Sequence, residues 1–547
     1  MTTYDAESKI WKGVSIPFDE NSENLGEIIL KILSETPERV LQIDSETDEQ
    51  FTCQDLKLSS IRVAQNLERI GVEVDDIVGI ISKQSHFATS IIIGCIIHGA
   101  ILNPLDETLN ENDIANIFNL TKPKIIITEP SFIPKLQNAL KSATFNYRIY
   151  SITDKSSLFL RASNFIKPTG TEENFVAPKF AKSLREKLYA ILCSSGTTGT
   201  PKGVCMSHLL STSTASFVKI FSGDRGAIRS YCPSPIYWAS GFYQNVLPIF
   251  SPNEIRIIPS NKPWYIEDFL KLVEKYKLTQ ALMPSMDLHM FVNFKNLSSY
   301  DLESLTNIMT GGTIISKVLR DKFAATFPNK NLQVAYGMTE SGGTISKPGE
   351  YKLEYSAGSI VLPNHEIKIV DDDGNKLGIN EKGEICIKSK YGFAGYYNNP
   401  EATKKAVDDE GFIITGDIGY FNEDNILFVF DRKKDVIKSK RMNVSASEIE
   451  NIIQEIEGVE FVTIVSIPDD LLQNLIVAAV IKQKGFEKLR EKSIVDYVAS
   501  KLPDEKHLSG GVYFFDKFPL TPSGKVKKSL LLEEIMKIRK ISNGYHQ

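Results

Sequence analysis

Blocks of apolar residues with two different periods alternate along the first half of the chain. Asp55–Ile70 has apolar side chains at helical spacing, which predicts an amphipathic helix. Ile77–Ile81 and Lys124–Thr128 are short apolar runs that predict buried strands. The most apolar run, Ala88–Leu102, contains a serine and a histidine and is short for a membrane span, so we predict a buried helix. Helices alternating with buried strands predict an α/β fold with largely parallel sheets.

A change of pattern near residue 430 indicates a second domain. The apolar strand Ile426–Phe430 is followed by the charged run Asp431–Asp435, which is either a domain boundary or only a solvated turn. Beyond it the pattern predicts one helix and two strands, at Ser447–Glu457, Phe461–Ser466 and Leu475–Ile481. We therefore predict a large N-terminal domain, residues 1–431, and a small α+β C-terminal domain, residues 432–547. Upstream, residues 151–186 are polar without a period, which predicts an irregular surface excursion.

Composition narrows the class of protein. The chain has 547 residues, which is too long for one core, and its net charge of -5 argues against a basic surface for nucleic acid or anionic membranes. Six cysteines without a CxxC pair argue against disulfides and a zinc site. We expect no signal peptide, no integral membrane segment and no nucleic acid partner. The chain ends Tyr545–Gln547 rather than with an SKL peroxisomal address, and we expect a cytoplasmic protein.

A loop rich in glycine and hydroxyl groups follows the predicted strand Tyr189–Cys193. Its glycines let the backbone turn its N–H groups inward, its hydroxyls add donors, and Lys202 adds a positive charge. These features favour a phosphate-binding loop over a flexible polar loop, although the GK[ST] of a Walker A sequence is missing. The predicted phosphate-binding residues are Ser194, Ser195, Gly196, Thr197, Thr198, Gly199 and Lys202.

Five segments, in this order, resemble the signatures of the adenylate-forming superfamily, which includes acyl-CoA synthetases, 4-coumarate–CoA ligases, beetle luciferases and peptide-synthetase adenylation domains. They are Ser194–Gly203, Tyr336–Glu340 (YGMTE), Thr415–Asp417 (TGD), Asp431–Lys438 and Pro522–Lys525 (PSGK). The segment 396–403 and the C-terminal domain are most similar to the luciferase and insect acyl-CoA synthetase branch. The resemblance covers nearly the whole chain. It implies stacked sheets with flanking helices in the N-terminal domain and a mobile C-terminal domain.

The resemblance also implies roles in the attack of a carboxylate on the α-phosphate of ATP. Both reactants are anions, so positioning and charge neutralisation dominate this reaction. Glu340 would hold Mg²⁺, and Thr339 would donate to the α-phosphate. The implied catalytic residues are Lys202, Thr339, Glu340, Lys438 and Lys525. The implied nucleotide-binding residues beyond these and the phosphate-binding loop are Gly312, Thr313, Tyr336, Gly337, Met338, Asp417 and Arg432, with Tyr336 on adenine and Asp417 and Arg432 on the ribose.

Two half-reactions in this superfamily use two orientations of the C-terminal domain. By resemblance, Lys434 is the hinge residue, and rotation about it removes Lys525 from the site and brings in the face that carries Lys438. The implied coenzyme A contacts are Lys438, Lys440 and Arg441. The implied acyl-binding residues are Trp238, Ser240, Gly241 and Gly311.

Four positions depart from the superfamily's pattern. Trp238 stands where luciferases and coumarate ligases have a histidine, and it is either a gate for the acyl chain or an ordinary core residue. Thr214 aligns with the luciferin-contacting arginine of beetle luciferases, which argues against a beetle-type luciferin pocket. Arg441 and Ala446 replace a glycine and a proline of the thioester-forming segment. Arg441 either obstructs the coenzyme A thiol or turns to the surface.

Three functions remain open from the sequence. The leading one is an AMP-forming acid–CoA ligase for a medium- or long-chain fatty acid, with ATP, the acid and coenzyme A as partners. The second is a luciferase-like monooxygenase that adenylates its acid and oxidises it with O₂. The third is a nucleotide-binding protein without turnover, which the intact Lys202, Glu340 and Lys525 disfavour. We expect a monomer or a weak dimer.

Overall fold

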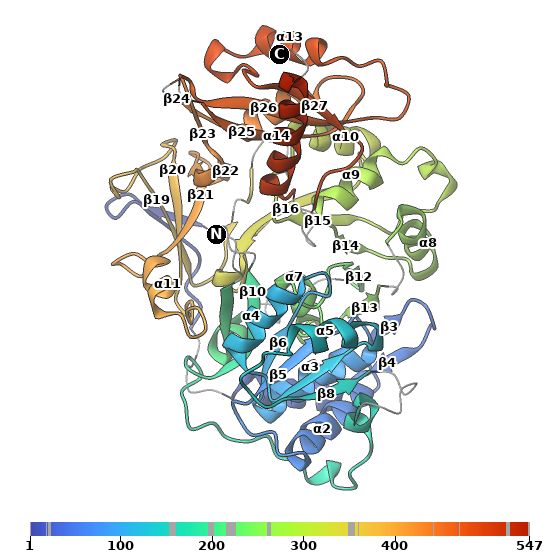
Figure 1. Cartoon of the computed structure of the whole chain (residues 1–547). Coiled ribbons are helices and arrows are strands. Elements are labelled where there is room, and N and C mark those ends of the chain that lie inside the picture. Colours follow the sequence, from blue (N-terminus) through green and yellow to red (C-terminus); the bar gives the residue numbers. More distant parts are fainter. Residues whose placement is uncertain are drawn as a thin grey trace.

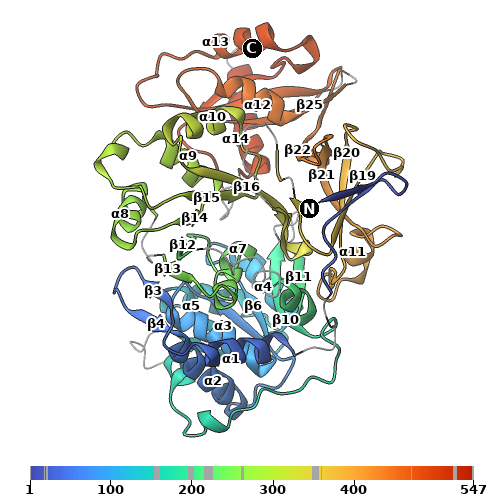
Figure 2. The ribbon, with the colours of Figure 1, turned by 180° about the vertical axis from the view of Figure 1, so that it is seen from behind.

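The computed structural model has a large N-terminal part and a small C-terminal part that lies against one end of it (Figures 1 and 2). It describes residues 2–17, 19, 23–152, 160–194, 202–214, 226–259, 264–347, 356–358, 360–440, 442–469, 471–520 and 526–544. These residues form five sheets, of which the three largest belong to the N-terminal part. The predicted α/β class is confirmed.

The first sheet contains seven strands, and all of its pairings are parallel except that of β10 with β11. In spatial order they are β11 (Lys202–Ser207), β10 (Leu188–Ser194), β6 (Ile101–Pro104), β5 (Ile77–Ile81), β7 (Ile125–Thr128), β8 (Arg148–Ser151) and β9 (Leu160–Arg161). Strands β5 and β7 confirm the predicted buried strands. The helices α4 (Glu111–Thr121) and α5 (Ile133–Ala139) contribute side chains to a core cluster with this sheet.

The second sheet contains nine strands and carries most of the predicted nucleotide-binding segments. In spatial order they are β18 (Ile360–Val361), β17 (Gly343–Lys347), β16 (Asn331–Met338), β15 (Asn307–Gly311), β14 (Gln280–Leu282), β12 (Ile228–Tyr231), β13 (Glu254–Ile258), β3 (Val40–Asp44) and β4 (Gln50–Thr52). The helices α7 (Ala239–Tyr243), α8 (Ile266–Tyr276), α9 (Ser285–Asn293) and α10 (Lys317–Thr326) connect its strands.

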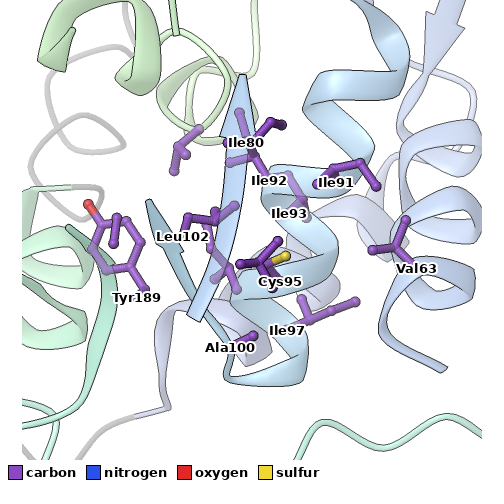
Figure 3. Close-up of a cluster of buried hydrophobic side chains, with 14 of the residues drawn as sticks. Val63, Ile80, Ile91, Ile92, Ile93, Cys95, Ile97, Ala100, Leu102 and Tyr189 are labelled. Atoms are coloured by element: carbon purple, nitrogen blue, oxygen red, sulfur yellow. The ribbon is translucent and has the colours of Figure 1, made fainter. Parts of the chain in front are cut away.

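The main hydrophobic core joins these two sheets through three helices, α1 (Leu25–Glu35), α2 (Cys53–Arg69) and α3 (His86–His98). Helix α2 confirms the helix predicted at Asp55–Ile70, and the side chain of Thr52 caps its first turn. Helix α3 is buried on all sides, and its isoleucines pack against Val63 of α2 and Ile80 of β5 (Figure 3).

The predicted helix Ala88–Leu102 is too long at its C-terminal end. Helix α3 stops at His98 because Gly99 adopts a left-handed conformation with φ +87°, and the chain then forms strand β6 from Ile101. The apolar run therefore belongs to two elements, which periodicity alone does not separate. Among the residues that the structure describes, no helix combines the length and the apolar character needed to cross a membrane.

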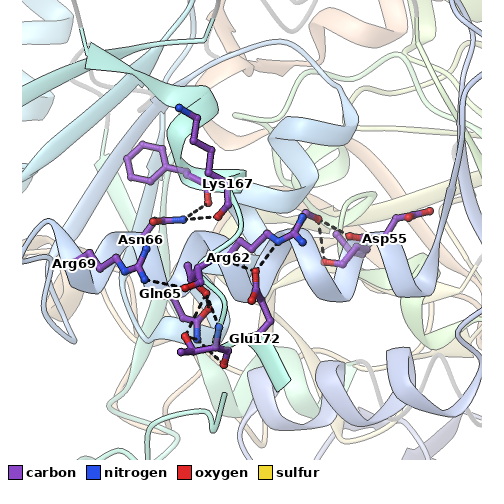
Figure 4. Close-up of polar contacts among 12 residues, drawn as sticks. Asp55, Arg62, Gln65, Asn66, Arg69, Lys167 and Glu172 are labelled. Atoms are coloured by element: carbon purple, nitrogen blue, oxygen red, sulfur yellow. Dashed lines mark hydrogen bonds and ion pairs between the residues drawn. The ribbon is translucent and has the colours of Figure 1, made fainter. Parts of the chain in front are cut away.

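The segment predicted as an irregular polar excursion contains short elements where the structure describes it, namely strand β9 and two 3₁₀ helices, and it is anchored to α2. Phe165 is buried in the main core, and Asn66 of α2 donates hydrogen bonds to the carbonyls of Phe165 and Lys167. Arg62 pairs with Glu172 at 2.9 Å (Figure 4). Residues 160–175 are thus part of the packed body rather than a free surface loop.

The third sheet completes the N-terminal part, and its strands come from both ends of the chain. In spatial order they are β1 (Thr3–Asp5), β2 (Ile10–Lys12), β19 (His365–Val370), β20 (Gly383–Ser389), β21 (Ile413–Phe421) and β22 (Leu427–Arg432). The short helix α11 (Pro400–Lys405) lies between β20 and β21 in the chain. Strand β22 confirms the predicted strand at Ile426–Phe430.

The C-terminal part has cores of its own. Its strands are β23 (Ile437–Ser439), β24 (Met442–Val444), β25 (Val459–Asp469), β26 (Gln473–Lys482) and β27 (Gly511–Phe515), and its helices are α12 (Ala446–Gln454), α13 (Glu491–Lys501) and α14 (Lys528–Gly544). The predicted helix and both predicted strands of this region are confirmed by α12, β25 and β26. Two hydrophobic clusters contain only residues from 437 onward. The boundary between residues 431 and 432 stays a prediction.

Candidate active site

A cavity of about 1860 Å³ lies among strands β10, β15 and β16 and the start of the C-terminal part. It gathers segments from distant parts of the chain, from Val14 near the N-terminus to Lys527 in the C-terminal part. The predicted site residues that line it are Ser194, Lys202, Trp238, Ser240, Gly311, Gly312, Thr313, Tyr336, Gly337, Met338, Thr339, Glu340, Arg432 and Lys434.

The two ends of the predicted phosphate-binding loop meet at the cavity. Ser194 ends β10 and Lys202 begins β11, and the antiparallel register places them opposite each other. The rest of the loop, including Ser195, Gly196, Thr197, Thr198 and Gly199, lies outside the described residues. The loop is therefore delimited by its two ends, and its predicted phosphate contacts stay a prediction.

Glu340 shares a polar group with Tyr396, a residue of the segment 396–403 to which the sequence analysis assigned no role in the site. Strand β16 ends at Met338, and the next turn buries Glu340, which is 7% exposed. The hydroxyl of Tyr396 donates to Oε1 of Glu340 at 2.9 Å, and Nζ of Lys202 lies 4.8 Å from the centre of the Tyr396 ring. Burial, reinforced by Glu340, raises the pKa of Tyr396, so this phenol stays a hydrogen-bond donor at neutral pH.

Glu340 is suited to a cation whose other ligands are not protein side chains. In the part of the chain that the structure describes, no group of three or more His, Cys, Asp or Glu side chains is placed to hold a metal ion. A single carboxylate at the wall of a large cavity fits Mg²⁺, which usually keeps several waters and phosphate oxygens as ligands. Glu340 is therefore the residue that would hold such an ion, and a bound phosphate and water would supply the remaining ligands.

A second polar group joins three residues that were predicted separately. The hydroxyl of Tyr336 donates to Oδ2 of Asp417 at 2.8 Å, and Nε of Arg432 lies 3.0 Å from Oδ1. Antiparallel pairing of β21 with β22 sets Asp417 opposite Arg432. Tyr336 and Arg432 line the cavity, as does Gly416, while the carboxylate of Asp417 is 7% exposed behind them.

Two unpaired hydroxyls, of Thr310 and Thr313, flank the glycine pair Gly311–Gly312 at one wall of the cavity. A side chain at position 311 would place Cβ 2.6 Å from the Ala335 carbonyl oxygen, and Gly312 has φ +82°. Thr310 and Thr313 are both among the residues that border the cavity, and their buried hydroxyls have no hydrogen-bond partner among the described residues. Buried polar atoms are normally paired, so these hydroxyls indicate a place for ligand or water.

The predicted acyl-binding residues divide into two kinds. Trp238 and Ser240 line the cavity, and so does Thr214, the position of the luciferase arginine. Because Trp238 faces the cavity and is only half-buried, its position favours the gate over a core residue. Gly241 is not among the lining residues. Its Cβ would lie 2.1 Å from the Pro235 carbonyl oxygen, so the missing side chain serves tight backbone packing rather than room for the acid.

A buried arginine holds this turn in place. Arg256 is 2% exposed and donates to the amide oxygens of Gln42, Asn245 and Gln84. Burial lowers its pKa to about 10. Asn245 in turn donates to the carbonyl of Gly241 at 2.9 Å. These contacts link strand β13 to the turn that carries Trp238. No short sequence motif predicts them.

Another polar pair at the cavity was also missed by sequence reasoning. Asp106, just after β6, and Tyr237, just before Trp238, both line the cavity, and Tyr237 donates a hydrogen bond to Asp106. Burial raises the pKa of Asp106. A lone aspartate and a lone tyrosine 131 residues apart carry no pattern that connects them.

The C-terminal part presents one of its two predicted faces to the cavity. Lys434 and Lys527 line it, whereas Lys438 is exposed on β23 and Lys440 pairs with Asp504 at 2.5 Å. Lys525 and Arg441 lie outside the described residues, and Lys527 follows Lys525 by two positions. Neither Lys438 nor Lys440 belongs to the lining in this arrangement.

Two protein-family models match most of the chain. The AMP-binding enzyme family matches residues 31–397, and the AMP-binding enzyme C-terminal domain matches residues 448–525. A luciferin 4-monooxygenase of Photinus pyralis is 29% identical over 88% of each chain, and a 4-coumarate–CoA ligase of Vanilla planifolia is 30% identical over 90% of each chain.

Solved structures agree with these relatives. The luciferase-like enzyme from the nonluminescent mealworm Zophobas morio is 28% identical, with a TM-score of 0.68 over 77% of this chain and 99% of that one. ATP-bound MatB from Rhodopseudomonas palustris, 22% identical, shares the fold with a TM-score of 0.82 over 94% of this chain and all of that one. The chain therefore belongs to the AMP-binding enzyme family, the adenylate-forming superfamily of luciferases and acid–CoA ligases.

Proposed function

We propose that the protein is an AMP-forming acid–CoA ligase that activates a medium- or long-chain carboxylic acid with ATP. The observation that carries the proposal is that two polar groups meet at one cavity, which continues past Trp238 between apolar walls. All of the Lys202–Tyr396–Glu340 group lines the cavity, and in the Tyr336–Asp417–Arg432 group Tyr336 and Arg432 line it while Asp417 joins them from behind. The first group suits a polyphosphate, and the second suits a nucleoside.

The proposed reaction uses these residues in two steps. An oxygen of the acid attacks the α-phosphorus, the bond to pyrophosphate breaks, and acyl-AMP remains in the cavity. Mg²⁺ supplies neutralising charge on the phosphates when it is bound. Lys202 and Thr339 neutralise and orient the phosphates, and the Tyr396 hydroxyl fixes the rotamer of Glu340. The thiol of coenzyme A then attacks the acyl carbonyl and releases AMP.

Acid-dependent exchange of labelled pyrophosphate into ATP tests the first step. Exchange that requires Mg²⁺ and a fatty or aryl acid is expected. Absence of exchange across a broad panel of fatty, aryl and amino acids would overturn the enzyme assignment.

A luciferase-like monooxygenase is the second candidate, and the relation to the Photinus pyralis luciferin 4-monooxygenase favours it. In that case the adenylate reacts with O₂ instead of a thiol. The two candidates differ in products: acyl-CoA with AMP for the ligase, and O₂ consumption, with or without light, for the oxygenase. Product analysis on one acid, with and without coenzyme A, distinguishes them.

Arg441 is the test of the thioester step. We propose that its guanidinium turns outward, because an unpaired buried arginine is costly, and that it meets the phosphates of coenzyme A. Arg441→Gly should then leave the binding of coenzyme A unchanged or weaken it slightly in assays of transfer from preformed acyl-AMP, with a larger effect at low salt. A many-fold faster transfer in single-turnover assays would show that Arg441 blocks the thiol, and would shift the assignment toward the oxygenase.

A further inference from the structure

The cavity extends from the nucleotide-binding segments along one face of the nine-stranded sheet. Gln280 and Leu282 of β14 and Met309 and Gly311 of β15 line it, and these are alternate residues of two paired strands. Alternation places all four side-chain positions on the same face of the sheet. We refer to this part of the cavity, from Gly311 to Gln280, as the acyl channel.

The strand register gives the length of the acyl channel. Gln280 pairs with Asn307, and Gly311 follows Asn307 by four residues, so the two ends are about 13 Å apart along the strand. An extended carbon chain advances roughly 1.25 Å per bond, so a chain of about ten bonds spans the same distance.

The far end of the acyl channel is polar, whereas its middle is apolar. Glu254 of β13 and Gln280 of β14 both line it. Ser230 of β12, between them, donates to Oε1 of Glu254 at 2.6 Å and is the register partner of Gln280. Ser230 and Gln280 are in register, and Glu254, two positions out of register, joins them through the hydrogen bond from Ser230; we call these three residues the polar row.

A further acceptor reaches the cavity from outside the sheet. Gln244 follows α7 and lines the cavity, and its Oε1 is buried without a hydrogen-bond partner among the described residues. Its neighbour Asn245 accepts a hydrogen bond from Arg256, which lies two positions from Glu254 on the same face of β13, so Gln244 belongs to the side of the cavity that carries the polar row. A plain hydrocarbon tail in the channel would leave this oxygen unpaired and would strip water from the Glu254 carboxylate. Both groups accept hydrogen bonds, so the ligand that satisfies them is a donor.

We propose that the polar row and Gln244 bind a hydroxyl group at the far end of the substrate, so that the preferred acid is a hydroxylated chain of about ten to twelve carbons. The inference rests on the proposed adenylation function and names its substrate class. A second carboxylate at the tail is excluded by repulsion from Glu254. An ammonium group is disfavoured because it must leave water to pass the apolar walls formed by Leu282 and Met309.

Pyrophosphate exchange with acids matched in length tests the proposal. The panel compares plain, ω-hydroxy, ω-methoxy, ω-amino and dicarboxylic acids at each length from eight to fourteen carbons. We expect kcat/KM for the ω-hydroxy acid to exceed that of the plain and ω-methoxy acids at least tenfold at the best length, since a site built to bond a hydroxyl rejects analogues without the donor.

Two variants locate the effect in the protein. In Gln244→Leu and in Gln280→Leu, the ratio of kcat/KM for the ω-hydroxy acid to kcat/KM for the plain acid should fall toward one. The main cause should be a lower KM for the plain acid. Gln137→Leu, at an exposed position on α5, is the matched control and should keep the wild-type preference. Thermal unfolding of all three reports whether they fold.

The outcomes separate the substrate class from the proposed function. Exchange with equal kcat/KM for plain and ω-hydroxy acids at every length overturns the hydroxyl site and leaves the adenylating enzyme intact. A preference for ω-amino acids, or one that survives both glutamine substitutions, also overturns it. No exchange with any acid overturns the enzyme assignment and the substrate class together.

Discussion

The contact between Tyr396 and Glu340 makes a specific prediction about catalysis. Tyr396→Phe removes only the hydroxyl that donates to Oε1 of Glu340 at 2.9 Å, and it keeps the ring beside Lys202. Hydrogen bonds to charged groups contribute about 1.5–3 kcal/mol. If this bond orients Glu340 during adenylation, kcat/KM for pyrophosphate exchange should fall roughly 10- to 150-fold.

A neighbouring tyrosine and a double-mutant cycle make this prediction sharp. Tyr397→Phe is the control, because no hydrogen bond joins Tyr397 to Glu340 among the described contacts, and its activity should remain near that of the wild type. Glu340→Gln alone should be severely impaired, and adding Tyr396→Phe to it should cost little more, since the two residues act as one unit. Fully additive losses, or equal effects of the Tyr396 and Tyr397 substitutions, would refute the coupling.

Three further predictions concern the hinge motion and stability. Lys525→Ala should depress adenylation by about 3 kcal/mol while thioester formation from synthetic acyl-AMP stays largely intact; equal damage to both half-reactions would contradict domain rotation. Arg256→Met should lower the free energy of unfolding by about 3–5 kcal/mol, because it leaves buried amide oxygens unpaired, and an unchanged urea midpoint would contradict this. Burial raises the pKa of Asp287 to about 7, so its contribution to stability is complete below its ordinary pKa near 4 and is lost as the pH rises through 7. Between pH 5 and pH 8 the free energy of unfolding, measured in urea, should therefore fall by roughly 2–3 kcal/mol less in Asp287→Asn than in the wild type. The same fall in both proteins would argue against a raised pKa.

Local elements and ordered motifs could be predicted from the sequence because their signals are local. Strand β5 at Ile77–Ile81 and helix α2 are encoded in the spacing of their own apolar residues. The segment Tyr336–Glu340 is a contiguous string, so its family could be identified without coordinates. The end of α3 at Gly99 was missed because an unbroken apolar run fits a buried helix and a buried strand equally well.

The composition of the candidate site was decided only by tertiary structure. Tyr396 meets Glu340 across 56 residues, and Arg256 meets Gln42 across 214 because β13 and β3 pair in the nine-stranded sheet. The polar row exists because parallel strands β12 and β14 place Ser230 opposite Gln280, and because the Ser230 side chain reaches Glu254 on β13. The sequence determines the chemistry of each side chain. Which side chains share a cavity depends on long-range packing, and local spacing in the sequence does not encode that packing.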